Sequence, residues 1–388
     1  MRTYDAAERR SRVGRRHHLA REEPGPDVIA VAERLVGLHA TDPATVYLSA
    51  RARVPGLAVA HVERALYDER TLVRQLGMRR TLFVVPRTLV PMIRSACTDA
   101  IAATARQRLV REIEAGGVAD DGAAWLEAAE EATMRTLVAA GQATGAELSR
   151  AVPELQTKLT YGEGRRWGGE VGVATRVLTL MSAEGRIGRG RPVGSWTSGQ
   201  HRWAPSVDEG HMGLDAEEAT ALLVRRWLAA FGPATVSDVV WWTGLGQRRV
   251  RAALEAADVV EVDLAGEVGV VLSDDLGPVP ESDPWVALLP ALDPTTMGWK
   301  HRAWYLGSLC PALFDGNGNA GPTVWCNGRV VGGWAQRRDG EVVHRLLVDI
   351  GSDAAASVEA EAHRLQRWLG DTRVTPRFPT PLERELKA

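Results

Sequence analysis

Residues 141–148 are Gly141-Gln142-Ala143-Thr144-Gly145-Ala146-Glu147-Leu148, and residues 232–239 are Gly232-Pro233-Ala234-Thr235-Val236-Ser237-Asp238-Val239. Both stretches follow the pattern Gly-x-Ala-Thr-x-x-acid-aliphatic. This spacing of threonine and acid is that of a capping box. The threonine hydroxyl accepts from the amide three residues on, and the acid accepts from the threonine amide. Each stretch therefore predicts the start of a helix.

The same order of elements surrounds both stretches. Hydrophobic periodicity predicts a helix before each (124–140 and 216–231) and a helix after each (about 172–184 and 247–257). A ribbon of two strands then follows, at 186–205 and at 259–272. This repeated order indicates internal repetition, and the alternative is a chance likeness between two ordinary helix caps.

The N-terminal region shows the same order. Periodicity predicts helices over 27–38 and 59–68, and Asp42 before Pro43 is typical of a cap followed by a first helical residue, with that helix ending near Arg51. Two β-type runs follow, at 72–76 and 81–85. Three helices followed by a two-stranded ribbon are the order of a winged helix.

The pattern changes after Pro278. Strands are predicted at 285–289, 323–326, 329–336 and 342–348, with a hairpin turn at Asn327-Gly328. A helix over about 354–369 and a last strand near 373–378 follow, and 274–283 is the expected linker. We predict an α+β protein of four parts: winged-helix units 1–112 (with an N-terminal arm), 113–207 and 208–278, and a β-rich C-terminal domain, 279–388.

Composition excludes several classes of protein. The chain has 388 residues, 45% of them hydrophobic and 25% charged, which is typical of a globular protein. It contains no long apolar run, and the charged N-terminus lacks the apolar core of a secretory signal. Its three cysteines are scattered. We therefore expect a cytoplasmic protein, associated with the nucleoid, without a disulfide framework.

The charge is unevenly distributed. Net charge is −2 overall, yet residues 1–112 carry +8 and residues 150–205 carry +5. Two basic blocks favour an anionic partner, nucleic acid first. Arginine greatly outnumbers lysine, which suits phosphate recognition but also follows from codon bias in a GC-rich genome.

The basic ribbon that begins at Arg186 is the clearest candidate for DNA contact. Glycines alternate with Arg189 and Arg191 in it, so that the backbone can approach a groove while guanidinium groups reach phosphates. The alternative is an ordinary solvated hairpin. Further phosphate-binding candidates are Arg79, Arg80, Arg165 and Arg166.

Signatures of common enzymes are mostly absent. The sequence has no Walker A loop, no Gly-x-Ser-x-Gly, no His-Glu-x-x-His and no dinucleotide-binding glycine run. The nine histidines lack metal-ligand spacing, and His17-His18 could belong to a solvated arm. The loop Gly316–Asn319 is expected to be a turn. We expect neither a metal nor an organic cofactor.

Four stretches carry a resemblance to a known family: Leu35-Val36-Gly37-Leu38-His39-Ala40-Thr41-Asp42-Pro43, Arg74, Met78-Arg79-Arg80-Thr81-Leu82 and Leu289-Pro290-Ala291-Leu292-Asp293-Pro294. They resemble the bacterial winged helix DNA-binding domain proteins, which include the interstrand-crosslink and alkylpurine DNA glycosylases of the AlkZ/YcaQ type. The resemblance covers nearly the whole chain. It implies tandem winged helices around a C-shaped channel for double-stranded DNA, alkylated or crosslinked, without an obligate protein partner.

The resemblance also points to a catalytic corner. Characterised glycosylases of this family carry two glutamines, or a glutamine and an acid, where this sequence has His39 and Thr41. Residues i and i+2 of an extended segment face the same side, so imidazole and hydroxyl could hold one water. Histidine can also accept a proton near neutral pH. The structural alternative is that Thr41 or Asp42 caps the next helix and His39 ends the preceding one.

Three hypotheses follow. The first is a DNA N-glycosylase in which His39 and Thr41 position a water for attack on C1′ of a bulky or alkylated purine nucleotide. The second is a non-catalytic winged-helix DNA-binding protein, such as a regulator or damage sensor. The third is a small-molecule-binding protein that has lost its DNA function.

Overall fold

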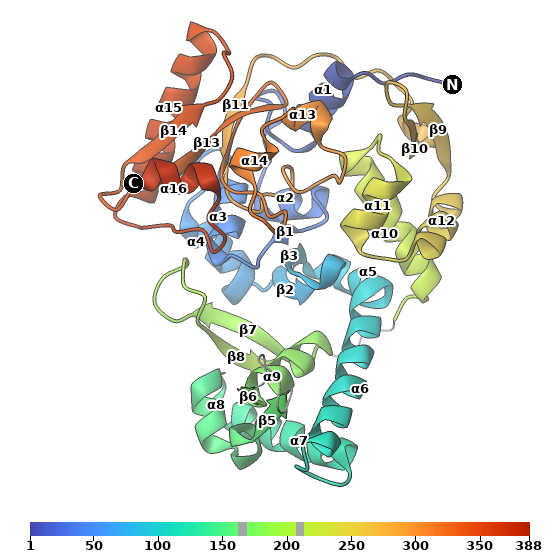
Figure 1. Cartoon of the computed structure of the whole chain (residues 1–388), viewed down its shortest axis with the longest axis vertical. Helices are drawn as coiled ribbons and strands as arrows, with labels where there is room; N and C mark the ends of the chain where they lie inside the picture. Colours follow the sequence, from blue (N-terminus) through green and yellow to red (C-terminus); the bar gives the residue numbers. More distant parts are fainter. Residues whose placement is uncertain (162–168, 207–212) are drawn as a thin grey trace. The chain divides into compact units, whose positions relative to one another are not determined.

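The computed structural model describes residues 1–161, 169–206 and 213–388. They form two compact units, one of Met1–Ile93 together with Leu214–Ala388, and one of Arg94–Gly213. In the colours of Figure 1, the first unit combines the blue N-terminal part with the yellow to red C-terminal part. Helices and strands are both abundant, which confirms the predicted α+β class.

The N-terminal part of the first unit follows the predicted order of helices and strands. Its sheet has the order β1-β3-β2, with antiparallel pairing throughout. Asp42 caps α3 and Pro43 is its first residue, as predicted. The elements are α1 (Ala6–Arg16), α2 (Val28–Arg34), β1 (Leu38–His39), α3 (Pro43–Arg51), α4 (Val59–Glu63) with a π-helical turn to Asp68, β2 (Leu72–Leu76), β3 (Leu82–Pro86) and α5 (Val90–Ile93).

The helix predicted over 27–38 is too long. It ends at Arg34, because Val36 and Gly37 adopt positive φ angles of 56° and 119°. A Cβ on Gly37 would lie 2.9 Å from the Val85 side chain, so glycine also permits the close approach of β3. The chain then turns into β1, which places His39 on a strand rather than at a helix end.

The middle of the first unit contains one of the two capping boxes. Thr235 Oγ1 accepts from the Asp238 amide and Asp238 accepts from the Thr235 amide, as predicted. The helix before this box packs its aromatic residues into the core, where Trp227 stacks on Phe231 and Phe231 meets Trp299. The elements are α10 (Ala216–Phe231), α11 (Val236–Thr243), α12 (Gln247–Ala256), β9 (Val259–Asp263) and β10 (Val268–Leu272).

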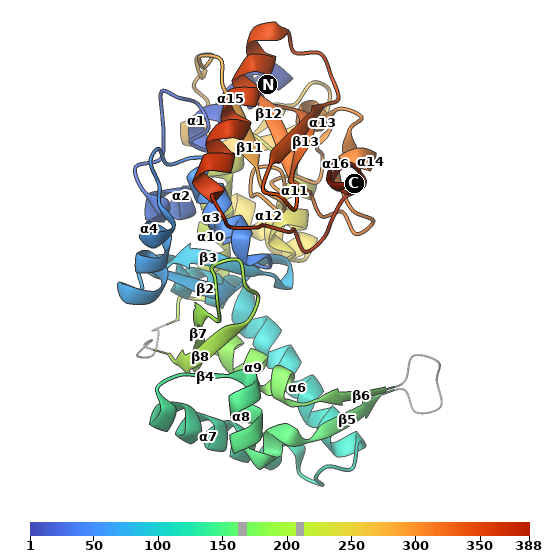
Figure 2. The ribbon, with the colours of Figure 1, turned by 90° about the vertical axis from the view of Figure 1, so that its left-hand side faces the viewer.

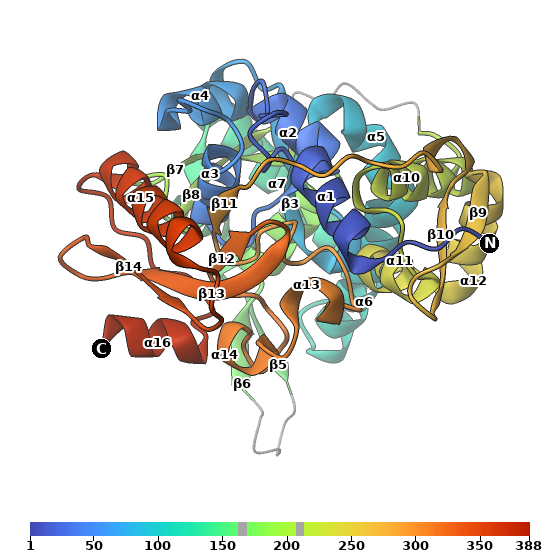
Figure 3. The same ribbon diagram turned by 90° about the horizontal axis from the view of Figure 1, so that it is seen from above.

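The C-terminal part of the first unit is a four-stranded antiparallel sheet of order β11-β12-β13-β14. Asn327 and Gly328 both have positive φ, as the predicted hairpin turn requires. Figure 3 shows α15 and α16 on opposite sides of β13 and β14. The elements are β11 (Val286–Leu289), α13 (Ala303–Leu306), α14 (Cys310–Leu313), β12 (Thr323–Cys326), β13 (Arg329–Gln336), β14 (Val342–Leu346), α15 (Ser352–Leu369) and α16 (Pro381–Lys387).

The strand predicted near 373–378 is wrong. Pro376 and Pro379 have no N–H to donate to a ladder, and the segment is irregular. Its amides donate to side chains instead, with Val374 N–H bonded to Gln336 and Arg377 N–H bonded to Asp42. The helix α16, which was not predicted, follows this segment.

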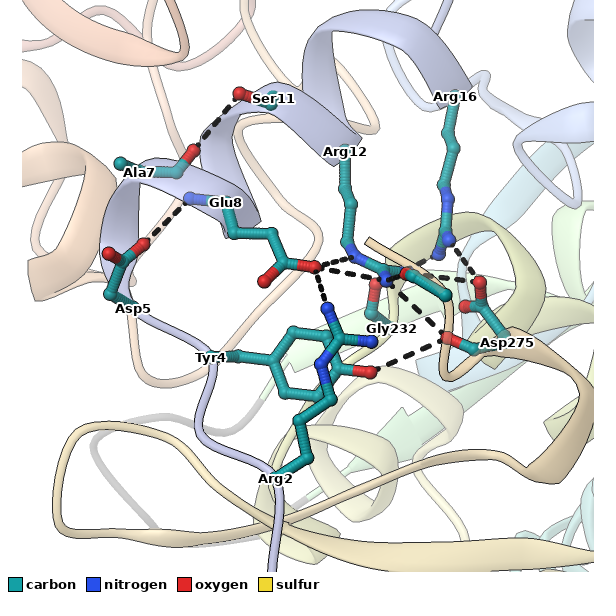
Figure 4. A network of polar contacts seen from close by, with 11 residues as sticks. Arg2, Tyr4, Asp5, Ala7, Glu8, Ser11, Arg12, Arg16, Gly232 and Asp275 are labelled. Atoms are coloured by element: carbon teal, nitrogen blue, oxygen red, sulfur yellow. Dashed lines mark hydrogen bonds and ion pairs between the residues drawn. The ribbon is translucent and has the colours of Figure 1, made fainter. Parts of the chain in front are cut away.

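The N-terminal residues pack against the expected linker and do not form a solvated arm. Figure 4 shows Arg12 and Arg16 of α1 converging on Asp275, with contacts of 2.9 and 2.5 Å. Arg12 also donates to the Gly277 carbonyl, and its side chain is 1% exposed. His17 is fully buried. Much of the positive charge of this region therefore serves the fold, because it is neutralised internally.

The second unit contains the other predicted capping box. Thr144 and Glu147 form the expected capping box at the start of α8. The pair β7-β8 follows the helices, as predicted, and the short β4 before α8 joins it in a sheet of order β4-β8-β7. A further ribbon, β5 with β6, was not predicted; Figure 2 shows it extending away from the helices of this unit. The elements are α6 (Asp99–Ala115), α7 (Gly122–Ala140), β4 (Ala143–Thr144), α8 (Gly145–Ala151), β5 (Lys158–Tyr161), β6 (Gly169–Gly172), α9 (Ala174–Ala183), β7 (Ile187–Pro192) and β8 (His201–Pro205).

Candidate active site

His39 lies on β1, directly opposite Phe83 of β3. The two rings are 5.2 Å apart between centroids, and His39 is 5% exposed. Its Nδ1 atom is buried and has no hydrogen-bond partner among the described residues. A buried nitrogen left without a partner is costly, so this atom is suited to bind a water or a substrate group.

The surroundings of His39 keep its imidazole neutral. Burial, together with the nearby positive charge of Arg79, lowers the pKa of His39 to about 3. At neutral pH the ring can donate or accept a hydrogen bond, but it cannot retain a proton taken from water. The lowered pKa favours a role for His39 in orienting water over the expected role as a general base near pH 7.

Thr41 is partly exposed and lies two residues further along the same corner. Between them, the Ala40 amide donates to the Leu82 carbonyl at 2.8 Å, which fixes the corner to the start of β3. The cap of α3 is Asp42, whose carboxylate accepts from the Ala44 and Arg377 amides. Burial raises the pKa of Asp42. Asp42 therefore caps α3, and this cap does not require the Thr41 hydroxyl.

Arg79 and Arg80 occupy the tight connection between β2 and β3, both with positive φ. The Arg79 guanidinium lies 4.3 Å from the ring centroid of Trp241, and Arg302 lies 5.1 Å from the same ring. Burial and the charge of Arg302 lower the pKa of Arg79 to about 10, so Arg79 is still a cation at neutral pH. Arg80 is exposed.

Sequence reasoning missed Trp241 and Arg302. Trp241 is on α11, one helical turn after the capping box, and Arg302 follows β11 by a long irregular segment. The only signal was the placement of a Trp241-Trp242 pair on a predicted helix, where one indole is buried and the other is partly exposed. No signal in the sequence predicts that this helix lies next to the turn that contains Arg79.

In the second unit, the three arginines predicted to contact DNA from the ribbon lie in different environments. Arg186 pairs with the buried Glu130 at 2.6 Å, beside Arg106, which also contacts Glu130. Arg189 lies over the ring of Trp203 at 5.3 Å, and Arg191 is exposed. Arg165 and Arg166 lie outside the described residues. The tryptophans of this ribbon, Trp196 and Trp203, are buried.

The stretch Leu289–Pro294 stabilises the fold. Asp293 accepts from both terminal nitrogens of Arg53, at 2.9 and 2.7 Å, and from the Ser49 hydroxyl at 2.7 Å. Thr295 bonds to the same arginine and to His17. This network joins α3, the end of α1 and the segment after β11.

Comparison with known proteins gives the family. The model of the family "DNA glycosylase AlkZ-like" matches residues 32–368. The chain belongs to the AlkZ-like DNA glycosylase family. Among solved structures, the AlkZ DNA glycosylase of Streptomyces sahachiroi matches with a TM-score of 0.70 and 21% identity, over 96% of this chain and 98% of that chain. A search of curated proteins finds no match.

Three further features of this AlkZ-like protein concern metals, membranes and the Gly316–Asn319 loop. No group of three or more metal-binding side chains occurs within residues 1–161, 169–206 and 213–388. In the same part of the chain, no helix is both long enough and apolar enough to cross a membrane. The Gly316–Asn319 loop is a turn in which Asp315 accepts from the Asn317 and Asn319 amides.

Proposed function

We propose that this AlkZ-like protein hydrolyses the N-glycosidic bond of bulky or alkylated purine nucleotides in duplex DNA, crosslinked duplexes included. The observation that carries the proposal is the buried Nδ1 of His39, which lacks a partner among the described residues, at the corner shared with Thr41. Family membership supports DNA as the substrate.

In the proposed mechanism, the imidazole of His39 and the hydroxyl of Thr41 orient one water toward C1′. The glycosidic C–N bond breaks and its electron pair goes to the base, which is cationic when alkylated and leaves as a neutral purine. The water oxygen bonds to C1′, and its proton passes to solvent because the pKa of His39, about 3, is too low to hold it. Orientation of the nucleophile is the main contribution of this corner.

Water rather than an amine is the nucleophile in this proposal. The chain has lysines only at positions 158, 300 and 387, none of them in the corner. With water as the nucleophile, the protein would be a monofunctional glycosylase, which removes the base and leaves the DNA backbone uncut.

DNA would be held by arginines at the surface of both units. Arg80 and Arg191 are exposed, and Arg79 and Arg189 each lie over a tryptophan ring. Arg165 and Arg166 complete the proposed set of phosphate ligands, whereas Arg186 would have to leave its ion pair with Glu130 to join it. The repeated helix, cap, helix and ribbon order supports three tandem winged-helix units around a C-shaped channel, acting on the nucleoid in the cytoplasm.

The test is release of a modified base from an alkylated duplex by the full chain. We expect His39→Ala to slow release by about 10²-fold at unchanged DNA affinity, because the nucleophile loses its orientation. His39→Gln should retain measurable activity, since an amide can also orient water. His363→Ala, an exposed histidine on α15, is the matched control and should behave as wild type.

If the wild type binds DNA and releases no base from any alkylated duplex, the enzyme proposal is wrong. The chain would then be a non-catalytic winged-helix DNA-binding protein, a regulator or damage sensor.

A further inference from the structure

Ser237 is hydrogen-bonded to His301 in the first unit, and Glu267 lies beside the other ring nitrogen of that histidine. Ser237 Oγ lies 2.8 Å from His301 Nε2, and His301 Nδ1 lies 3.2 Å from Glu267 Oε1. The three residues come from the start of α11, the segment after β11 and the residue before β10. With its proton on Nδ1, His301 accepts from the serine hydroxyl through Nε2 and turns its N–H side toward the Glu267 carboxylate. This is the arrangement of nucleophile, base and orienting carboxylate found in acyl-transfer enzymes.

The backbone holds His301 against the start of α11. Asp238 is fully buried, and its Oδ1 accepts from the amides of both Lys300 and His301 at 2.8 Å. Its other oxygen completes the capping box with Thr235. Because Asp238 is the neighbour of Ser237, the same carboxylate fixes the nucleophile and the base relative to each other.

The Ser237 hydroxyl has a second neighbour, Thr235 Oγ1, at 3.0 Å. Thr235 Oγ1 donates its own hydrogen to Asp238 at 2.9 Å, so it can only accept from Ser237. The serine hydrogen thus has two acceptors, and the imidazole is the nearer one. Attack on an electrophile needs the proton to move to that imidazole.

The surroundings also suit the charges of an acyl-transfer reaction. Ser237 is the second residue of α11, and the first-turn amides of a helix have no intrahelical acceptor, so those of Val236 and Ser237 can face a developing oxyanion. Arg9 lies nearby as a buried cation: burial lowers its pKa to about 10, and Asp238 and Glu267 partly oppose this lowering. The His301 and Glu267 side chains are 41% and 51% exposed, which leaves the site open to solvent.

We propose that Ser237, His301 and Glu267 are a hydrolytic triad that cleaves small activated carboxylic esters, a second activity separate from base release. Ser237 Oγ bonds to the acyl carbon as its proton passes to His301 Nε2. The ester C–O bond then breaks, and His301 returns the proton to the departing alcohol. Water, deprotonated by His301, next attacks the acyl-serine, and the carboxylic acid leaves as Ser237 regains its proton. Small esters are the expected class because the His301 and Glu267 side chains are largely exposed, so that a small substrate can reach Ser237 directly from solvent.

The test uses the full chain with two probes, a fluorophosphonate that traps nucleophilic serines and 4-nitrophenyl acetate. We expect the phosphonate on the peptide that contains Ser237, and ester hydrolysis above the buffer rate. Ser237→Ala should abolish that adduct. His301→Ala and Glu267→Gln should slow labelling, His301→Ala by about 10²-fold or more, as expected for lost general-base help.

Ser308→Ala, an exposed serine of the same unit, is the matched control and should keep both signals. Thermal denaturation of each variant shows whether it remains folded. If Ser237 is not labelled in the folded wild type, or is labelled equally fast in His301→Ala, the proposal is overturned. Base release measured on the same samples is independent of this result, so failure of one activity leaves the other open to its own test.

Discussion

Arg53 and Asp293 form a two-point ion pair inside the first unit, although 240 residues separate them in the sequence. Both side chains are 0% exposed. The carboxylate also accepts from Ser49 and from the Thr295 amide, so its lone pairs are well satisfied. This pair fixes α3, and with it the corner of His39 and Thr41, to the segment that follows β11.

Asp293→Asn should destabilise the protein strongly. It leaves a buried guanidinium without its counter-charge, for which a cost of about 3–5 kcal/mol in the free energy of unfolding is expected. The control is Glu385→Gln, which breaks the exposed Arg345–Glu385 pair and should cost less than about 1 kcal/mol. Urea denaturation of both variants provides the comparison, and equal losses would contradict a central role for Asp293.

Thr41→Ala and Asp42→Ala should separate capping from catalysis. Asp42 supplies the cap of α3, so Asp42→Ala should cost about 0.5–2 kcal/mol of stability. Thr41→Ala should leave the melting temperature unchanged and slow base release by up to about 10²-fold, because the water is less well oriented. A lower melting temperature with a normal rate in Thr41→Ala would show that its role is structural.

Stability should depend on pH through His39. Its folded-state pKa of about 3 is below the ordinary value of 6.5, so between these values the unfolded chain binds a proton that the folded protein does not bind. The free energy of unfolding therefore decreases as pH falls through this window, by up to about 1.4 kcal/mol per pH unit for one histidine. His39→Gln should reduce this slope, whereas Thr41→Ala should keep the slope of the wild type. Urea denaturation at a series of pH values between these limits measures it, and identical slopes would refute the prediction.

Replacement of Arg189 and Arg191 by alanine should weaken binding to unrelated DNA sequences about equally, because phosphate contacts carry no base information. Each lost phosphate contact should reduce the slope of log affinity against log salt by about 0.9. Arg345→Ala, which removes an exposed arginine of β14, is the control. Binding isotherms at several salt concentrations decide the matter: a double variant that binds like wild type would make the ribbon an ordinary solvated hairpin.

Local sequence was sufficient for the elements whose signals span a few residues. The capping boxes at Thr144 and Thr235, the Asp42 cap and the turn at Asn327-Gly328 all form as predicted. Their hydrogen bonds or φ angles involve residues at most three positions apart, so the local order of residues is enough to specify these caps and turns.

The tertiary structure decided what depends on partners far away in the chain. The basic N-terminal residues became a packed helix because Arg12 and Arg16 meet Asp275. The segment near 373–378 is not a strand, because Pro376 has no N–H to donate to a ladder and the amides of Val374 and Arg377 donate to Gln336 and Asp42 instead. Local periodicity contains no information on such distant acceptors.

The same division holds for the sites. Sequence and resemblance together singled out the corner of His39 and Thr41, because the two proposed residues are only two positions apart in the chain. Burial of His39, the approach of Arg79 to Trp241, and the meeting of Ser237 with His301 and Glu267 were decided by tertiary packing. A side chain's pKa and its hydrogen-bond partners depend on the atoms folded around it, and those atoms come from elements that only the complete fold brings together.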